Sequence, residues 1–439
     1  MKNRHATRTT LMASLLVLTM IVVAACGGNN NGGGTNGGNS GGAGGEEQVT
    51  LTLSHPWTSP NPDNDVYKAR IAAFEEANPN IKIEQDAVAA AQYKTKLFTL
   101  ATANNLADIN VVWPGADLDP LTSGDLLLPL NDYMDNWDGL VREGSLTGYN
   151  VDGNQFAIPT KQNYVDIVYY NKELLAQVGY DTFPETYADF IDMVKKLKEA
   201  GITPISLGNK EKWPLQSSYI SVLAQRFGGA DFLEKVVAGE AKFTDPEFVS
   251  AVGVIDELTK LEAFNVDANN MDSVQAQDYL IQGKAAMHIS SATVDARIRT
   301  NNEEGDKFGI ALFPSVEGGK GEAGIAAGVS QFGIAISSQL DEAKQEAALK
   351  FLEFFVSEDL YQDLTAAGIL VPADIEPNSD INPYLQEMME LTSKGSTPVF
   401  DAVVPTAAAK ELENGLQAIT IGRSTPEEVA ASTQDELGN

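Results

Sequence analysis

A short polar cluster between a proline and an apolar run could supply hydrogen bonds to a bound molecule. After Pro159 the chain reads KQNY (161–164), an apolar run follows at 167–170, and a helix is expected from about residue 171. Amide side chains donate and accept hydrogen bonds at the same time. The pattern is typical of a chain that leaves one lobe, passes a solvated cleft and enters another. It is equally typical of a core strand preceded by a polar loop, and the residues alone leave both interpretations open.

Aromatic residues follow the predicted strands. His55 and Trp57 come after an alternating strand, Trp113 ends a second one, and Trp213 lies in a polar loop. Ligands of parallel sheets gather beyond the carboxyl ends of the strands, so these positions indicate a cleft. Packing is the alternative role for each indole ring, and for Trp137 it is the role we expect.

Alternating strands and helices predict the architecture that positions these groups. Strands are expected at 49–53, 81–84 and 108–113, with helices at 64–77 and 93–103 between them. This order predicts a parallel α/β sheet. Later segments are more helical, with return crossings expected at 308–313 and 331–336.

Length and charge narrow the class of protein. The chain has 439 residues, which favours two lobes, and a formal net charge of -31. Such an acidic surface argues against nucleic acid or anionic lipid as a partner. The single cysteine, Cys26, excludes an intrachain disulfide and a cysteine-based metal site.

The N-terminus reads as a targeting segment. A basic start and a short apolar run end in VAAC (23–26), which resembles the lipobox of bacterial lipoproteins. We expect residues 1–25 to be a signal peptide and Cys26 to carry a lipid. Residues 26–47 would form a flexible Gly/Asn-rich linker. The protein would then be anchored at the extracellular face of a bacterial cell membrane. A lipid anchor of this kind favours a Gram-positive organism.

The globular chain resembles the extracellular solute-binding proteins of family 1, the sugar-type receptors that include maltose-binding protein. The resemblance runs through LTLSHPW (51–57), ADINVVW (107–113), YYNKELL (169–175), GNKEKW (208–213), GKAAMHISS (283–291), GVSQFGIAIS (328–337) and GRSTPEE (422–428). It implies an α/β, two-lobe fold of the periplasmic-binding-protein type (type II), with three interlobe crossings and a ligand cleft between the lobes. The N-lobe would comprise 48–160 with 309–335, and the C-lobe 161–308 with 336–439.

The same resemblance implies a function. The protein would be the substrate-binding lipoprotein of an ABC importer, a monomer that captures a sugar, preferably an oligosaccharide, and delivers it to permease subunits. It implies no cofactor and no catalytic residue. One departure is visible, because Ala292 and Thr293 follow Ser291 where many relatives carry a tryptophan. Residues expected to contact the sugar are Trp57, His55, Trp113, Gln162, Asn163, Tyr164, Trp213, Ser290, Ser291 and Ser330.

Two rival classes of protein fit the sequence less well. A secreted glycoside hydrolase would need a carboxylate pair, yet Asp108 begins a predicted strand and Asp166 lies inside one, which favours packing roles. A serine hydrolase is poorly supported as well, because His55 stands next to Pro56 and His288 lies inside an apolar predicted strand. A metal-binding receptor would need His/Asp/Glu clusters at ligand spacing, and the sequence has none. Calcium binding by exposed carboxylates is left as an open alternative.

Overall fold

The computed structural model describes residues 48–300, 305–378 and 380–438. The chain divides into two units, Met1–Glu46 and Glu47–Asn439, and everything described below belongs to the second. The predicted signal peptide, Cys26 and the linker lie outside the described residues. Within the described part, no helix combines the length and the apolar character needed to cross a membrane.

The first sheet contains the predicted parallel strands. Its order is β12-β11-β3-β1-β2, with β6 paired to β11. β1 runs parallel to β2 and β3, and β11 runs antiparallel to β3 and β6. The strands are β1 (Val49–His55), β2 (Ile81–Ala87), β3 (Ile109–Val112), β6 (Ile158–Tyr164), β11 (Ala326–Ile336) and β12 (Ser396–Pro398).

The second sheet has the order β10-β7-β9-β8. β7 is antiparallel to β9 and β10, and β8 is parallel to β9. Its strands are β7 (Ile167–Asn171), β8 (Thr203–Ser206), β9 (Ala285–Ser290) and β10 (Phe308–Ala311); a separate small hairpin joins β4 (Asn150–Val151) and β5 (Asn154–Gln155).

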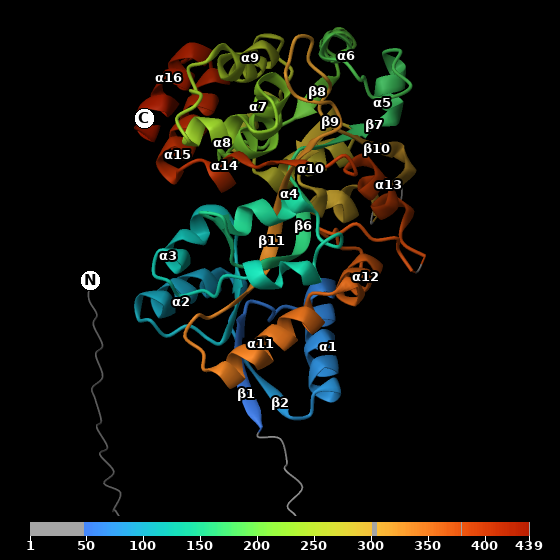
Figure 1. The fold of residues 1–439 in the computed structure, drawn as a ribbon. Helices are drawn as coiled ribbons and strands as arrows, with labels where there is room; N and C mark the ends of the chain where they lie inside the picture. Colours follow the sequence, from blue (N-terminus) through green and yellow to red (C-terminus); the bar gives the residue numbers. More distant parts are fainter. Residues whose placement is uncertain (1–47, 301–304, 379, 439) are drawn as a thin grey trace, which may run out of the picture. The chain divides into compact units, whose positions relative to one another are not determined.

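Each sheet is accompanied by its own helices (Figure 1). Each set of strands and helices encloses an apolar core. The first core uses α1 (Pro62–Ala77), α2 (Ala90–Thr102), α3 (Asp119–Thr122), α11 (Glu342–Phe355) and α12 (Glu358–Ala366). The second uses α5 (Lys172–Gln177), α6 (Tyr187–Glu199), α7 (Ser221–Gly228), α8 (Phe232–Val237), α9 (Pro246–Lys260), α14 (Phe400–Val403), α15 (Thr406–Ile419) and α16 (Pro426–Leu437). A third, smaller cluster involves α10 (Ser273–Ile281) and α13 (Pro383–Leu391), and α4 (Glu143–Leu146) lies beside β6.

The chain passes between the two sheets three times. It goes from β6 to β7 through Val165 and Asp166, returns from β10 to β11, and leaves the first sheet's helices after α12 to reach α14. The predicted lobe boundaries remain a prediction. The core contacts differ from these boundaries in one segment. α11 and α12 pack with the first sheet, whereas the predicted boundaries place 336–439 in the C-lobe.

Strand β6 is the main element that the sequence did not predict as a strand. Its sequence, IPTKQNY, contains a proline and no apolar alternation. It is a strand because β11 supplies hydrogen bonds along its length, with Gly328 opposite Tyr164 and Ile334 opposite Ile158. The predicted return strand 331–336 accordingly begins earlier, at Ala326. Each segment is stabilised as a strand by a partner that is distant in the sequence. The local residue pattern cannot indicate such a partner.

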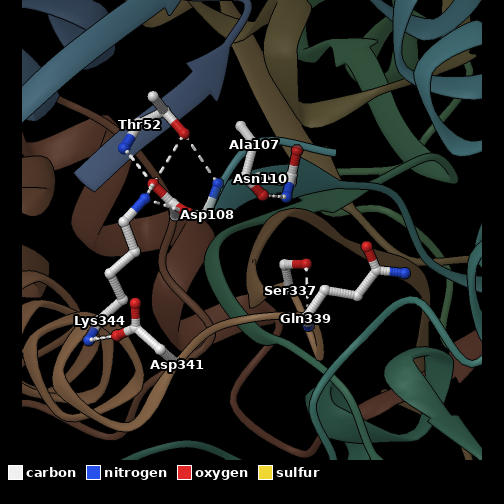
Figure 2. Close-up of polar contacts among 8 residues, drawn as sticks. All are labelled: Thr52, Ala107, Asp108, Asn110, Ser337, Gln339, Asp341 and Lys344. Carbon is white, nitrogen blue, oxygen red and sulfur yellow. Dashed lines mark hydrogen bonds and ion pairs between the residues drawn. The ribbon is translucent and has the colours of Figure 1, made fainter. Parts of the chain in front are cut away.

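Asp108 ties the amino end of β3 to β1 and α11 (Figure 2). Its Oδ2 accepts hydrogen bonds from the backbone N–H of Thr52 at 2.8 Å and from the Thr52 hydroxyl at 3.0 Å. The Lys344 ammonium lies 3.0 Å from both carboxylate oxygens. The packing role predicted for this carboxylate therefore has a direct structural basis.

Replacing Asp108 by Ala should lower the free energy of unfolding by about 2–4 kcal/mol, because the donors that it serves lose their acceptor. Urea denaturation measures the loss. Asp359→Ala is the matched control, since that carboxylate also pairs with a cation, Arg70, but is 79% exposed. The control should cost less than about 1 kcal/mol. Equal losses in the two variants would show that the Asp108 contacts contribute nothing beyond a surface ion pair.

Candidate functional site

A cavity of about 420 Å³ lies beside the crossing strands β6 and β11. The polar side chains in its lining include Lys161 and Asn163 from β6 and Gln331 from β11. Other walls come from the segment after β9, the segment after α12, and α13. The cavity therefore draws its lining from elements of both sheets.

Asn163 joins the two halves at this cavity. Its Oδ1 accepts a hydrogen bond of 2.9 Å from the hydroxyl of Ser291, which follows β9 of the second sheet. The Ser291 hydroxyl also lies 2.8 Å from that of Thr293, another lining residue. Because an amide has two N–H donors besides its oxygen, Asn163 can serve a ligand while keeping this bond. Asn163 and Ser291, both predicted as ligand contacts, are thus brought together.

Lys161 is oriented by a carboxylate and a ring. Its ammonium lies 2.8 Å from Asp63 at the start of α1 and 4.2 Å from the centroid of the Phe332 ring. Phe332 has a positive φ of 55°, which is uncommon for a residue with a bulky side chain. Alternate side chains of a strand share a face, so Lys161 stands on the same face as Asn163. The arrangement offers a fixed cation and an amide at one corner of the cavity.

A second cavity of about 600 Å³ is lined by Gln162 and Ser330. The Ser330 hydroxyl donates to Gln162 Oε1 at 2.9 Å. The far wall comes from the segment after β3 and from α14, which approach closely: a side chain at Gly115 would meet the carbonyl oxygen of Ala402 at 2.2 Å. Gln162 lines both cavities, whereas Ser330 lines only the second.

The three tryptophans predicted as ligand contacts do not share a cavity, because neither of the two cavities has an indole in its lining. Trp57 is 1% exposed and stacks between His55, at 4.7 Å, and Tyr67, at 4.3 Å. Trp113 is half-buried and meets the ring of Phe332 edge to face at 5.6 Å. Trp213 is 37% exposed. Trp113 therefore lies outside both linings and contacts Phe332, the ring beside the Lys161 ammonium, and Trp57 is part of the core.

Three further predicted contacts are also buried. His55 accepts from the N–H of Trp57 through Nδ1, so its Nε2 donates to Gln85, and burial lowers the pKa of this imidazole. Tyr164 is 2% exposed, and burial raises the pKa of its phenol. Ser290 ends β9 and is 5% exposed. Their roles as ligand contacts stay predictions, and the contacts seen are those of packed residues.

The sequence does not indicate several residues that line the site or hold its side chains in place. Asp63 reads as an ordinary acidic residue at a helix start, and Phe332 as part of an apolar strand. Asp295 lines the cavity and pairs with Arg299 at 2.6 Å; burial raises its pKa although the guanidinium opposes this. Lys161 was visible in the polar cluster but not as a site residue. Only its partners on distant segments distinguish it, and no local signal could have found them.

The chain is similar to known proteins over most of its length. The model of the bacterial extracellular solute-binding protein family matches residues 58–362. An uncharacterised ABC transporter extracellular-binding protein from Pyrococcus horikoshii is 23% identical over 82% of this chain and 80% of its own length. A multiple sugar-binding protein from Streptococcus mutans is 23% identical over 74% of this chain and 76% of its own.

Solved structures agree on the fold. A chitin oligosaccharide binding protein superposes with a TM-score of 0.72, at 23% identity, over 89% of this chain and 98% of its own. A maltose-bound protein from T. maritima gives a TM-score of 0.65, at 20% identity, over 89% and 99%. The two-lobe periplasmic-binding-protein fold predicted from the sequence is thereby confirmed. The family match supports the interpretation as a solute-binding protein rather than the hydrolase alternative. The chain belongs to the bacterial extracellular solute-binding protein family.

Proposed function

We propose that this protein binds a sugar, preferably an oligosaccharide, in the cavity beside β6 and β11 and delivers it to the permease of an ABC importer. The observation that carries the proposal is the Asn163–Ser291 hydrogen bond at a cavity lined from both sheets. A ligand held there touches both halves at once. Lys161, Asn163 and Gln331 supply donors and acceptors for hydroxyl groups.

Related proteins support a sugar as the ligand. The Streptococcus mutans relative is named a multiple sugar-binding protein, and structural neighbours are named for chitin oligosaccharide and for maltose. A buried sugar hydroxyl left without a partner costs about 1–3 kcal/mol, so a polar corner of this kind favours a polyhydroxylated ligand.

Transport requires that ligand occupancy change the arrangement of the two halves. A ligand that contacts both halves in one arrangement and only one half in another shifts the population toward the first. The crossings are the segments that can absorb the change in backbone angles. The closed arrangement would then be presented to the permease, and the sugar would leave unaltered.

The cellular location of the protein is part of the same proposal. Lipidation of Cys26 after removal of residues 1–25 would tether a monomeric body through a Gly-rich linker to the outer face of a cell membrane. The VAAC sequence supports this anchoring, and a Gram-positive host would make such an anchor necessary. Metabolic labelling with an alkyne-bearing fatty acid should mark the wild-type chain and leave Cys26→Ser unlabelled.

A thermal-shift screen over monosaccharides and oligosaccharides tests the function. A ligand that binds only the native state raises the melting temperature, by mass action. At least one sugar should do so in a concentration-dependent way, and chromatography of the mixture should return that sugar unchanged. Absence of any shift across the panel, or appearance of a product, would overturn the proposal.

Two of the tryptophans predicted as ligand contacts carry a separate prediction. Trp113→Ala should weaken the best sugar at least about tenfold, because its ring supports Phe332 beside Lys161. Trp213→Ala should have a comparable effect, because an exposed indole ring can cover the C–H face of a sugar. Trp137→Phe is the control, since that indole donates to Val356 in the core of the first sheet. Unchanged calorimetric affinity in either alanine variant would remove that tryptophan from the site.

A further inference from the structure

The cavity beside β6 and β11 has one wall that hydrogen bonding does not explain. Ile369 and Leu370, which follow α12, and Leu385 and Met388 of α13 form an aliphatic surface in its lining. Met388 is 2% exposed and belongs to the third apolar cluster, so the wall is continuous with a packed core. A ligand made only of hydroxyl-bearing rings would leave this wall without a matching surface.

Small residues also line this cavity. Ala292, Ala296, Ala367 and Gly368 line the cavity where larger side chains would fill it. Backbone contacts fix the position of the wall, because the N–H of Gln162 in β6 donates to the carbonyl of Leu370 at 2.9 Å. The segment that carries Ile369 and Leu370 is therefore fixed to β6.

Aromatic side chains are absent among the described residues that line this cavity. Stacking against the C–H face of a sugar ring is thus not what the aliphatic wall provides. Branched and thioether side chains instead suit a compact apolar group such as a methyl. The polar corner of Lys161, Asn163 and Gln331 lies in the same cavity, so one ligand would present hydroxyls to one side and the apolar group to the other.

We infer that the sugar taken by this cavity carries a methyl-terminated substituent, seated against Ile369, Leu370, Leu385 and Met388. This inference rests on the proposed function, since it assigns the chemistry of the ligand to the same site. An acetamido group and a 6-deoxy carbon both end in a methyl group and are the two sources of this chemistry.

Matched sugar pairs test the inference by isothermal titration calorimetry on the chain from Cys26 onward. N,N′-diacetylchitobiose and cellobiose differ only in acetamido against hydroxyl groups, and L-fucose and L-galactose only in the 6-deoxy carbon. The methyl-bearing member of at least one pair should bind at least about fivefold more tightly, as burial of a methyl group predicts. Preference in the first pair identifies an acetamido sugar, and preference in the second a deoxy sugar.

Two variants locate the preference. Ala296→Leu fills the cavity from an exposed position, and Leu385→Asn makes the aliphatic wall polar. Both should weaken binding of the methyl-bearing member more than binding of its hydroxylated partner, so that the preference falls to less than about twofold. Leu391→Asn on the same helix is the control, because Leu391 packs on the third cluster outside the cavity lining and should leave the preference intact.

Each outcome decides a distinct point. Equal or better binding of both hydroxylated partners overturns the inference and leaves the proposed function standing. A preference that survives Ala296→Leu and Leu385→Asn also overturns it, because the methyl group then lies elsewhere. Failure of every sugar in the wider screen overturns the function and the inference together.

Discussion

Replacing Asn163 by Leu should weaken binding of the best sugar by about fiftyfold or more. The substitution keeps the size of the side chain but removes the acceptor of the Ser291 hydroxyl and the donors that face the ligand. Two lost hydrogen bonds at about 1–1.5 kcal/mol each account for this factor. Calorimetric titration measures the affinity, and circular dichroism melts confirm that the variant is folded.

Asn265 provides the matched control. It is also a buried amide, 7% exposed, and it accepts a hydrogen bond from the backbone N–H of Leu207 away from both cavities. Asn265→Ala should lower the melting temperature and leave the sugar affinity within about twofold. An Asn163→Leu protein that binds as tightly as wild type would remove the central residue from the proposed site.

Replacing Arg226 by Met should destabilise the protein by about 3–5 kcal/mol near pH 9 and by much less near pH 5. Asp166 lies fully buried in the first crossing, and Arg226 of α7 is the cation that interacts with it. Asp166 also accepts a hydrogen bond of 2.9 Å from the N–H of Ala327 at the start of β11. Arg226 itself donates to the carbonyl of Phe313. The pair thus lies where two crossings meet.

The pH dependence follows from the protonation of Asp166. Burial raises its pKa from 3.8 to about 7, although Arg226 and the Ala327 N–H act in the opposite direction. The folded state therefore holds a proton that the unfolded chain has lost, and this contribution to stability is full at low pH and disappears as the pH rises toward about 7. Above that pH the carboxylate is charged and depends on Arg226. Below that pH the neutral acid does not depend on Arg226, so the loss of the guanidinium lowers the free energy of unfolding by less.

Urea denaturation of wild type and Arg226→Met at both pH values measures this difference. Lys260→Met serves as the control, because its ammonium pairs with Asp256 on the surface and its side chain is 74% exposed. The control should change the free energy of unfolding by less than about 1 kcal/mol at either pH. An Arg226→Met loss that is the same at both pH values would show that Asp166 does not titrate in this range.

The sequence predicted the outline of the fold because that outline rests on local patterns. The alternation of 49–53 and the apolar run 108–113 became β1 and β3. Strand β6 escaped prediction because its hydrogen bonds go to β11, more than a hundred residues away. Helices α11 and α12 show the same limit, since their patterns indicate an apolar face but not which sheet receives it.

The site was predictable in part for the same reason. Asn163 and Ser291 carry polar groups at the ends of strands, a position that indicates a cleft, and the structure brings them together. Trp57 has an equally suggestive position after β1, yet it is enclosed by His55, Tyr67 and Phe355. Residue type and position cannot distinguish a ring that faces a ligand from one that faces a helix. That distinction depends on the packing of α1 and α11 over the strand end.

The central claim is that one sugar molecule is held unaltered at the crossing strands by residues from both halves. Amide hydrogen exchange, read by mass spectrometry with and without the best sugar from the screen, tests it most directly. The account predicts added protection in peptides that cover β6, the segment after β9, and β11, with recovery of one intact sugar per protein molecule. Protection confined to other segments, or recovery of a cleaved sugar, would contradict it.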